Sequence, residues 1–198
     1  MQKGFTLLEL LIVIGILAIL STTMIIVINP AEMLKKARDS QRISNLNSLK
    51  TAISYYITDA AIPSIGATNQ CFSSNVTGCT CLGLAASTTT AQTIAGAGWI
   101  PINFTSVTGG PPISNLPQDP NASTLITSNP SRYFVYLTSS TTSNTFTLVT
   151  NMESTYYSNG GTGNVESTDG GYIATLYEVG TSQVLTTTSA SCFPGTGT

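Results

Sequence analysis

The chain begins with a short polar leader and then becomes strongly apolar. After residues 1–4, which include one lysine, the apolar run extends to Ile28 and contains a single charged residue, Glu9. The 19 residues that follow Glu9 carry no charge, and as a helix they would rise about 28 Å. Since the hydrocarbon core of a bilayer is about 30 Å thick, we predict a membrane-spanning helix over residues 5–29. The isolated acid at its edge would cost about 2–3 kcal/mol to insert without a partner.

A second helical pattern follows at once. Residues 31–59 contain neither glycine nor proline, and apolar residues recur there at spacings of three and four, which marks one helix face. The apolar positions of that face are Leu34, Ala37, Ile43, Leu46, Leu49, Ile53, Tyr56 and Ile57. We therefore predict an amphipathic helix over residues 30–60. Pro30 removes one helical hydrogen bond and disfavours helix at Asn29, so a kink or local melting is expected at this junction.

Beyond residue 60 the pattern changes to short apolar stretches between Gly, Pro, Asn and Ser/Thr clusters, which is typical of short strands and loops. Residues 133–137 and 146–150 are predicted to form a hairpin. Residues 172–179 are a third candidate strand, and 183–186 are a candidate edge strand. Because so small a sheet needs a helix to complete its core, we predict an α+β head over residues 61–198.

A long connector, residues 61–130, separates the helix from the predicted hairpin. Its Trp99–Pro101 segment is apolar and is expected to pack on the helix. The LPQDP segment at residues 116–120 contains two prolines, which predicts a rigid turn that delivers the chain into the sheet.

Charge divides the chain into two parts. Charged residues make up only 8% of the sequence, whereas about a quarter is usual for a soluble domain. Residues 1–50 hold six basic and three acidic residues, and residues 51–198 hold one basic and six acidic residues. The charged side chains expected mostly outside the apolar face of the second helix are Lys35, Arg38, Asp39, Arg42 and Lys50. Two interpretations of the basic cluster stay open: a solvated helix face, or pairing with the acidic heads of neighbouring copies.

The chain has four cysteines: Cys71, Cys79, Cys81 and Cys192. An even number in an exported chain indicates disulfides. Cys79 and Cys81 would point to opposite faces of an extended strand, so they should take different partners. We expect one of them to bridge Cys71 and the other to bridge Cys192, where the longer loop would stabilise the fold by about 3–5 kcal/mol. Because the chain lacks histidine, the zinc alternative is a four-thiolate site.

Catalytic signatures are missing from the sequence. It has no histidine, nucleophile elbow, P-loop or dinucleotide-binding glycine fingerprint, so we expect neither an enzyme nor a cofactor. The Gly-rich stretch 159–164 is interpreted as a flexible loop, with a Ca²⁺ site near Glu166 and Asp169 as the alternative. Three triplets fit the N-glycosylation sequon, although such triplets arise often by chance in a Thr-rich chain; they begin at Asn75, Asn103 and Asn121.

The segment KGFTLLELLIVIGILAIL resembles the class III signal of type IV pilins and pseudopilins, because leader, Gly, Phe, Thr, Leu and Glu fall in the family's order. No A-x-A pattern, as an ordinary secretory signal would have, follows the apolar run. The resemblance implies that prepilin peptidase cuts between Gly4 and Phe5 and that the Phe5 amine is N-methylated. Glu9 becomes the fifth residue of the mature chain. Buried in a filament core it needs an opposite charge, for which the Phe5 amine of an adjacent subunit is the candidate. The alternative is an interfacial Glu in a plain single-pass anchor.

The resemblance also implies the pilin fold and a structural role. We expect a precursor in the cytoplasmic (inner) membrane that an assembly platform and a motor ATPase build into a homo-oligomeric extracellular filament on the cell surface. The main alternative is a pseudopilin of a secretion or DNA-uptake machine, because the LP-x-DP pattern of residues 116–120 resembles a segment of major pseudopilins and of several Gram-positive-like pilins. A membrane-anchored binding protein that never polymerises is the third interpretation. The few charges of the head give no indication of nucleic-acid binding.

Overall fold

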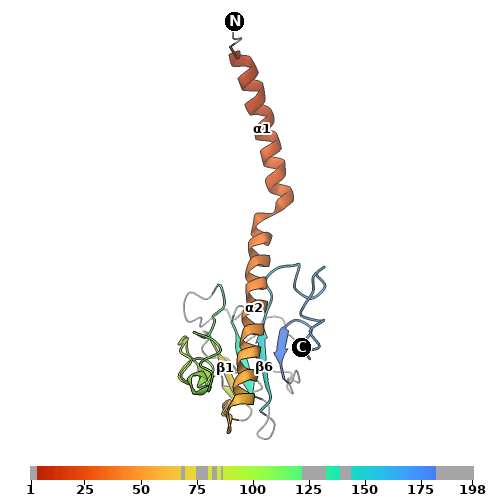
Figure 1. Cartoon of the computed structure of the whole chain (residues 1–198). Coiled ribbons are helices and arrows are strands. Elements are labelled where there is room, and N and C mark those ends of the chain that lie inside the picture. Colours follow the sequence, from red (N-terminus) through yellow and green to blue (C-terminus); the bar gives the residue numbers. More distant parts are fainter. Residues whose placement is uncertain are drawn as a thin grey trace.

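The computed structural model describes residues 4–67, 70–74, 80–81, 84–85, 87–121, 133–138 and 144–181. A long helical stem extends from a small head, and the N-terminal end of the stem lies far from the head (Figure 1). The stem consists of α1, Leu7–Ile28, and α2, Pro30–Asp59. Within these described ranges, one helical stretch is long and apolar enough to cross a membrane, and α1 supplies its apolar part.

A single residue, Asn29, separates α1 from α2. Its φ of 45° and ψ of 74° lie in the left-handed region, which Asn tolerates better than most residues do. The N–H of Asn29 donates to the carbonyl of Ile25 at 3.3 Å, and its side-chain oxygen accepts the N–H of Glu32 at 3.4 Å. Pro30 occupies the first position of α2, where a backbone N–H is not needed. The same residue therefore ends one helix and caps the next.

The head is built on a five-stranded sheet in the order β4-β1-β5-β6-β7, beside a separate two-stranded β2–β3 sheet. Neighbouring strands of the larger sheet are antiparallel, except that β1 and β4 run parallel. The strands are β1 Cys71–Ser73, β2 Thr80–Cys81, β3 Leu84–Ala85, β4 Ser87–Thr88, β5 Val135–Thr138, β6 Phe146–Thr150 and β7 Tyr177–Gly180. A 3₁₀-helix, η1, spans Phe104–Ser106.

The α+β prediction is confirmed, and its central hairpin is β5 and β6, with Val135 opposite Val149. The third predicted strand is wrong in extent: β7 begins at Tyr177, and residues 172–176 form turns and bends. The candidate strand 183–186 lies outside the described residues. Strands β1 to β4 come from the connector; two or three residues are too few for an alternating pattern to show in the sequence.

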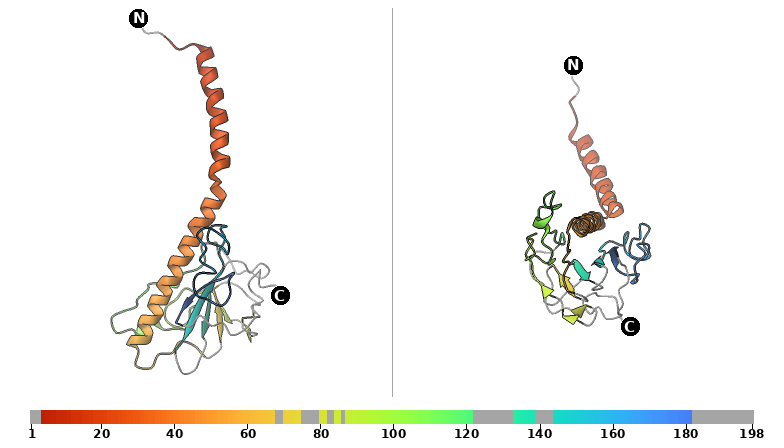
Figure 2. Two further views of the ribbon diagram at one scale, coloured as in Figure 1. Left: turned by 90° about the vertical axis from the view of Figure 1, so that its right-hand side faces the viewer. Right: turned by 60° about the horizontal axis from the view of Figure 1, so that its bottom comes forward.

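The core of the head forms where α2 lies against one face of the sheet, as Figure 2 shows. Trp99 and Ile100 are fully buried in the same cluster, and the Trp99 indole N–H donates to the carbonyl of Pro117 at 3.0 Å. The connector therefore closes the core from the side, as its apolar segment predicted. Larger members of the cluster are Leu46, Leu49, Ile53, Trp99, Ile100, Ile102, Phe104, Phe134, Tyr136, Phe146 and Leu148.

Candidate functional site

The predicted processing site lies on an open stretch of chain just before α1. Gly4 and Phe5 are both exposed, Phe5 to 82%, and neither belongs to a helix or strand. A side-chain carbon added at Gly4 would meet no atom within 4 Å. A protease can therefore reach the Gly4–Phe5 peptide bond without unwinding α1.

Thr6 and Glu9 form the N-terminal cap of α1. The Thr6 hydroxyl accepts the backbone N–H of Glu9 at 3.3 Å, while the Glu9 carboxylate accepts the backbone N–H of Thr6 at 3.0 Å and its hydroxyl at 2.9 Å. This reciprocal arrangement is a capping box, which satisfies amides that a helix start leaves open. The carboxylate also lies at the positive end of the helix dipole. In the single chain Glu9 thus bonds to Thr6, and its predicted pairing with Phe5 of another subunit stays a prediction.

Apart from Glu9 and the hydroxyl residues 21–23, the described surface of α1 is apolar and open. The large apolar side chains whose burial is described in α1 are between 45% and 87% exposed, from Ile28 at the low end to Leu7 at the high end. None of the charged residues of the chain falls between Glu9 and Glu32. A helix that is apolar all round is stable in lipid or among other apolar helices. We therefore expect α1 to be surrounded by lipid or by other apolar helices.

A buried ion pair joins α2 to the connector. Arg42 donates from Nε to Asp119 Oδ2 at 2.6 Å and from Nη2 to Asp119 Oδ1 at 2.9 Å, the two-point geometry that suits arginine and a carboxylate. Its Nη1 donates to Asp39 Oδ1, one helical turn away, at 2.6 Å. Both carboxylates and the guanidinium are fully buried or nearly so. The LPQDP segment is thereby fixed to α2 through its acid.

Two carboxylates of α2 also hold a loop of the head by its backbone. Asp39 accepts the N–H groups of Glu153 and Ser154 at 2.7 to 3.0 Å. Seven residues earlier, Glu32 accepts both the N–H and the hydroxyl of Thr155, at 2.6 and 2.7 Å. Because charge-assisted hydrogen bonds are about twice as strong as neutral ones, the start of the loop after β6 is firmly docked on the first half of α2.

The basic residues of α2 mostly find partners inside their own chain. Arg38 pairs with Glu153, with Nε 2.8 Å from Oε2, and Lys36 lies over the ring of Tyr156 at 4.5 Å. Lys35 forms an exposed pair with Glu32 at 3.6 Å. Neither open interpretation of the basic cluster therefore holds for the fully buried Arg42. Arg38 is paired within its own chain but remains partly exposed to solvent.

The placement of Asp39 and Arg42 outside the buried face was also wrong. The buried positions of α2 are Asp39, Arg42, Leu46, Leu49, Ala52, Ile53 and Tyr56, whereas Leu34 is 62% exposed. Asp39 and Arg42 continue the three–four spacing of the apolar positions toward the N-terminus, so the signal was present in the sequence. Residue type alone predicts exposure here, because charged residues are seldom buried. The carboxylate that compensates the buried charge of Arg42 belongs to Asp119, 77 residues away in the sequence.

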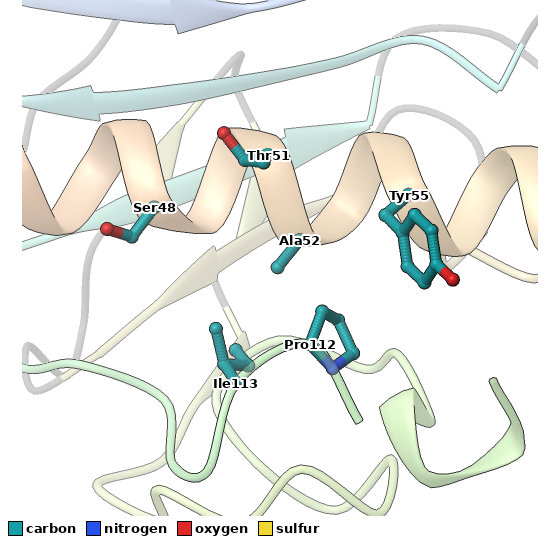
Figure 3. A pocket seen from close by; sticks show the side chains of 6 residues that line it. All are labelled: Ser48, Thr51, Ala52, Tyr55, Pro112 and Ile113. Carbon is teal, nitrogen blue, oxygen red and sulfur yellow. The ribbon is translucent and has the colours of Figure 1, made fainter. Parts of the chain in front are cut away.

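A shallow groove lies between α2 and the connector. It has a volume of about 570 Å³ and lies between Ser48, Thr51, Ala52 and Tyr55 of α2 and the Pro112–Ile113 segment (Figure 3). A second hollow of about 350 Å³ continues it past Asn45 toward Pro117. The lining carries no charged side chain, so the groove offers shape and hydroxyl groups but no acid or base for chemistry.

The predicted cysteine and calcium sites are described only in part. Cys71, in β1, is buried and disulfide-bonded, while Cys79 and Cys192 lie outside the described residues and the side chain of Cys81 is not described. The disulfide pairing thus stays a prediction. Glu166 accepts the N–H groups of Met152 and Asn159 at 2.9 and 2.8 Å, so it fastens the Gly-rich loop. Among the described residues no cluster of three potential metal ligands occurs.

Residues 1–25 match the family model of the prokaryotic N-terminal methylation motif, the class III signal of type IV pilins and pseudopilins. The resemblance expected from the order of leader, Gly4, Phe5 and Glu9 is therefore confirmed for this part of the chain. No curated protein and no solved structure matches the chain. The motif ends within α1, so it covers the leader and most of α1 and does not extend to α2 or the head.

Proposed function

We propose that this chain is a structural subunit of a type IV pilus-like filament. The observation that carries the proposal is a methylation motif that extends into an exposed helix, which after Glu9 carries no charge. Such a helix needs lipid before assembly and a bundle of like helices after it. A subunit that is stored in the cytoplasmic membrane and then polymerised outside it encounters both environments in turn.

Processing creates the charge that assembly needs. Cleavage by prepilin peptidase after Gly4 exposes the amine of Phe5, which is then methylated. In a bundle of apolar helices Glu9 cannot remain buried and unpaired, and the Phe5 amine of an adjacent subunit supplies the opposite charge. To form this pair, the Glu9 carboxylate releases its hydrogen bonds to Thr6. The pair between Glu9 and the neighbouring Phe5 amine then fixes the axial stagger between adjacent subunits.

The head and α2 should move as one rigid unit during assembly. The Arg42–Asp119 pair holds α2 to the connector, and Asp39 holds it to the loop after β6. A motor ATPase and an assembly platform, which this chain does not supply, would lift α1 out of the membrane into the filament. Assembly therefore changes the surroundings of α1 and leaves the packing of the head intact.

A pseudopilin of a secretion or DNA-uptake machine is the second candidate. It is favoured by the LPQDP segment, whose Asp119 forms the buried pair with Arg42. A pseudopilin would share the processing of Gly4–Phe5 but form only a short piston. The abundance of the chain in surface filaments separates the two functions.

The deciding experiment uses filaments sheared from the cell surface, imaged by electron microscopy and analysed by mass spectrometry. A dominant subunit that begins at N-methylated Phe5 supports the filament function. Scarcity in filaments, together with processing at Phe5 in membranes, supports the pseudopilin. A Gly4→Leu variant should retain residues 1–4 and stay in the membrane, while the matched control Gly15→Ala, where an added carbon meets no atom within 4 Å, should be processed normally.

A further inference from the structure

One turn of the connector, residues 103–105, has the sequence Asn-Phe-Thr and an ordered polar surface. Asn103 Oδ1 accepts two hydrogen bonds from Thr105, from the backbone N–H at 3.1 Å and from the hydroxyl at 2.6 Å. The side-chain amide and the hydroxyl are thereby held next to each other. Within the described part of the chain, the amide nitrogen Nδ2 of Asn103 donates no hydrogen bond, so it is the reactive atom left open.

Phe104 anchors this turn from the inside. Its side chain is fully buried and meets the ring of Tyr56 edge-on at 6.0 Å between centroids, and its N–H donates to the carbonyl of Ile94 at 2.8 Å. Asn103 and Thr105, on either side of it, are both exposed. The core thus holds the middle residue while the two polar side chains face solvent.

The surroundings leave room for a large polar substituent. Thr105, Ser106, Thr108, Gly109 and Gly110 are exposed and uncharged, and a side-chain carbon added at Gly110 would meet no atom within 4 Å. Thr108 is bonded to Asp59, the last residue of α2, by an N–H···O bond of 2.8 Å. The turn therefore lies at the end of α2 farthest from α1, about 45 Å along a 30-residue helix.

We propose that Asn103 is the acceptor of an N-linked glycan. The triplet N-x-T with a residue other than proline in the middle is the acceptor sequence of this modification. The donor class is a glycan carried on a polyprenyl diphosphate. Asn103 Nδ2 forms the bond to the anomeric carbon and loses one proton to a base of the transferase. The bond from that carbon to the phosphate oxygen breaks, so the lipid diphosphate leaves with the electron pair. No atom is oxidised or reduced.

Among the three sequons, only the one at Asn103 has all of its residues in the described part of the chain. Asn75 lies outside the described residues, as do the residues that follow Asn121. The backbone N–H of Asn121 is bonded to Asp119 at 2.9 Å, next to the buried pair with Arg42. Asn103 is the acceptor for which the described chain shows the amide, the hydroxyl and the open surface together. The proposal rests on the proposed function in one respect, because the head must be exported to meet the transferase.

The test uses the full chain purified from its native host. Mass spectrometry with electron-transfer fragmentation would read the N-terminal peptide and the peptide around residue 103 in the same sample. We expect a saccharide on Asn103 in the wild type, in Thr105→Ser, which keeps the hydroxyl, and in the control Asn121→Gln. We expect its loss in Asn103→Gln and in Thr105→Val, which has the shape of threonine without the hydroxyl.

The outcomes separate this proposal from the proposed function. A chain that begins at Phe5 and carries an unmodified Asn103 overturns the glycan proposal and leaves the filament subunit standing. A chain that retains residues 1–4 and carries an unmodified Asn103 overturns both. A saccharide found at another residue, with Asn103 bare, also overturns the proposal. Unfolding of Thr105→Val at the wild-type denaturant midpoint, followed by the fluorescence of the buried Trp99, would show that its loss of glycan is not a loss of folding.

Discussion

Arg42 and Asp119 share two hydrogen bonds, of 2.6 and 2.9 Å, in the interior of the head. Both side chains are fully buried. One residue belongs to the stem and the other to the connector, between strands β4 and β5. The pair therefore links two parts of the molecule that are 77 residues apart. Removing one partner should strongly reduce the stability of the head, because the other partner would remain as an unpaired buried charge.

Replacing Arg42 by methionine should destabilise the head by about 3–5 kcal/mol, because Asp39 and Asp119 would both lose their cation inside the protein. Denaturant unfolding of the full chain in detergent, followed by the fluorescence of Trp99, measures the change. The control is Lys35→Met, which removes an exposed pair and should change the free energy of unfolding by less than about 1 kcal/mol. Equal effects of the two variants would contradict the importance of the buried pair.

The stability of the head should fall as the pH rises from about 4.5 to about 7. Burial raises the pKa of Glu178 to about 7 from its ordinary value of 4.5, against the opposing hydrogen bonds from the N–H groups of Ile173 and Tyr172. In that window the folded chain binds a proton that the unfolded chain has released, so the stabilisation present below pH 4.5 is lost as the pH passes through 7. The nearby charge of Asp169 acts in the same direction.

Glu178→Gln should flatten this pH dependence, since the amide cannot ionise. Burial also raises the pKa of Glu166, so a smaller slope of the same sign should remain in the variant. Unfolding of the full chain at a series of pH values from 4 to 8 (roughly the span over which such shifts act) provides the comparison. A stability that increases with pH between 4.5 and 7 in the wild type would show that the sign is wrong.

Glu9→Gln should be processed at Gly4–Phe5 but should not assemble into filaments. Glutamine keeps the size of the side chain and can accept the Thr6 N–H, so α1 still begins normally, yet the charge that would pair with the Phe5 amine is gone. Counting filaments by electron microscopy, with N-terminal sequencing of the membrane fraction, gives both readouts. Assembly at wild-type efficiency would favour the plain membrane anchor.

Joining the two stem helices should straighten the stem. In the double variant Asn29→Ala with Pro30→Ala, no residue favours the left-handed conformation and the missing N–H is restored, so one continuous helix is expected. Spin labels on the exposed residues 21 and 41 would then be separated by about 30 Å along the axis. The control Asn29→Gly, which tolerates the same φ, should retain the wild-type distance distribution. An unchanged distribution in the double variant would show that packing, and not Asn29, sets the junction.

Much of the stem could be predicted from sequence because its signals are local. An uncharged run of membrane length and a three–four apolar spacing each need only neighbouring residues, and both helices appear where these patterns lie. The hairpin β5–β6 was predictable for the same reason. Strand β1 was not, because it pairs with β5 far along the chain, with Cys71 opposite Leu137. Strand β4 has only two residues and pairs with β1 alone, so it was not predictable either.

The buried charges of α2 were missed for a different physical reason. A sequence pattern assigns each residue to a face by its own polarity, and this assigned Asp39 and Arg42 to the solvent. Their burial depends on Asp119 and on the amides of a distant loop, which compensate the charges. Position within the helical spacing was the better guide here than residue type.

The way in which α2 holds the loop after β6 bears on how freely this surface can evolve. At Ser154 and Thr155, the carboxylates of Asp39 and Glu32 bind the main chain, through an N–H that every amino acid except proline possesses. A substitution of the exposed Thr155 would therefore keep the backbone bond to Glu32 and lose only the bond from its hydroxyl. The attachment of this loop to α2 thus depends little on which side chain residue 155 presents to solvent.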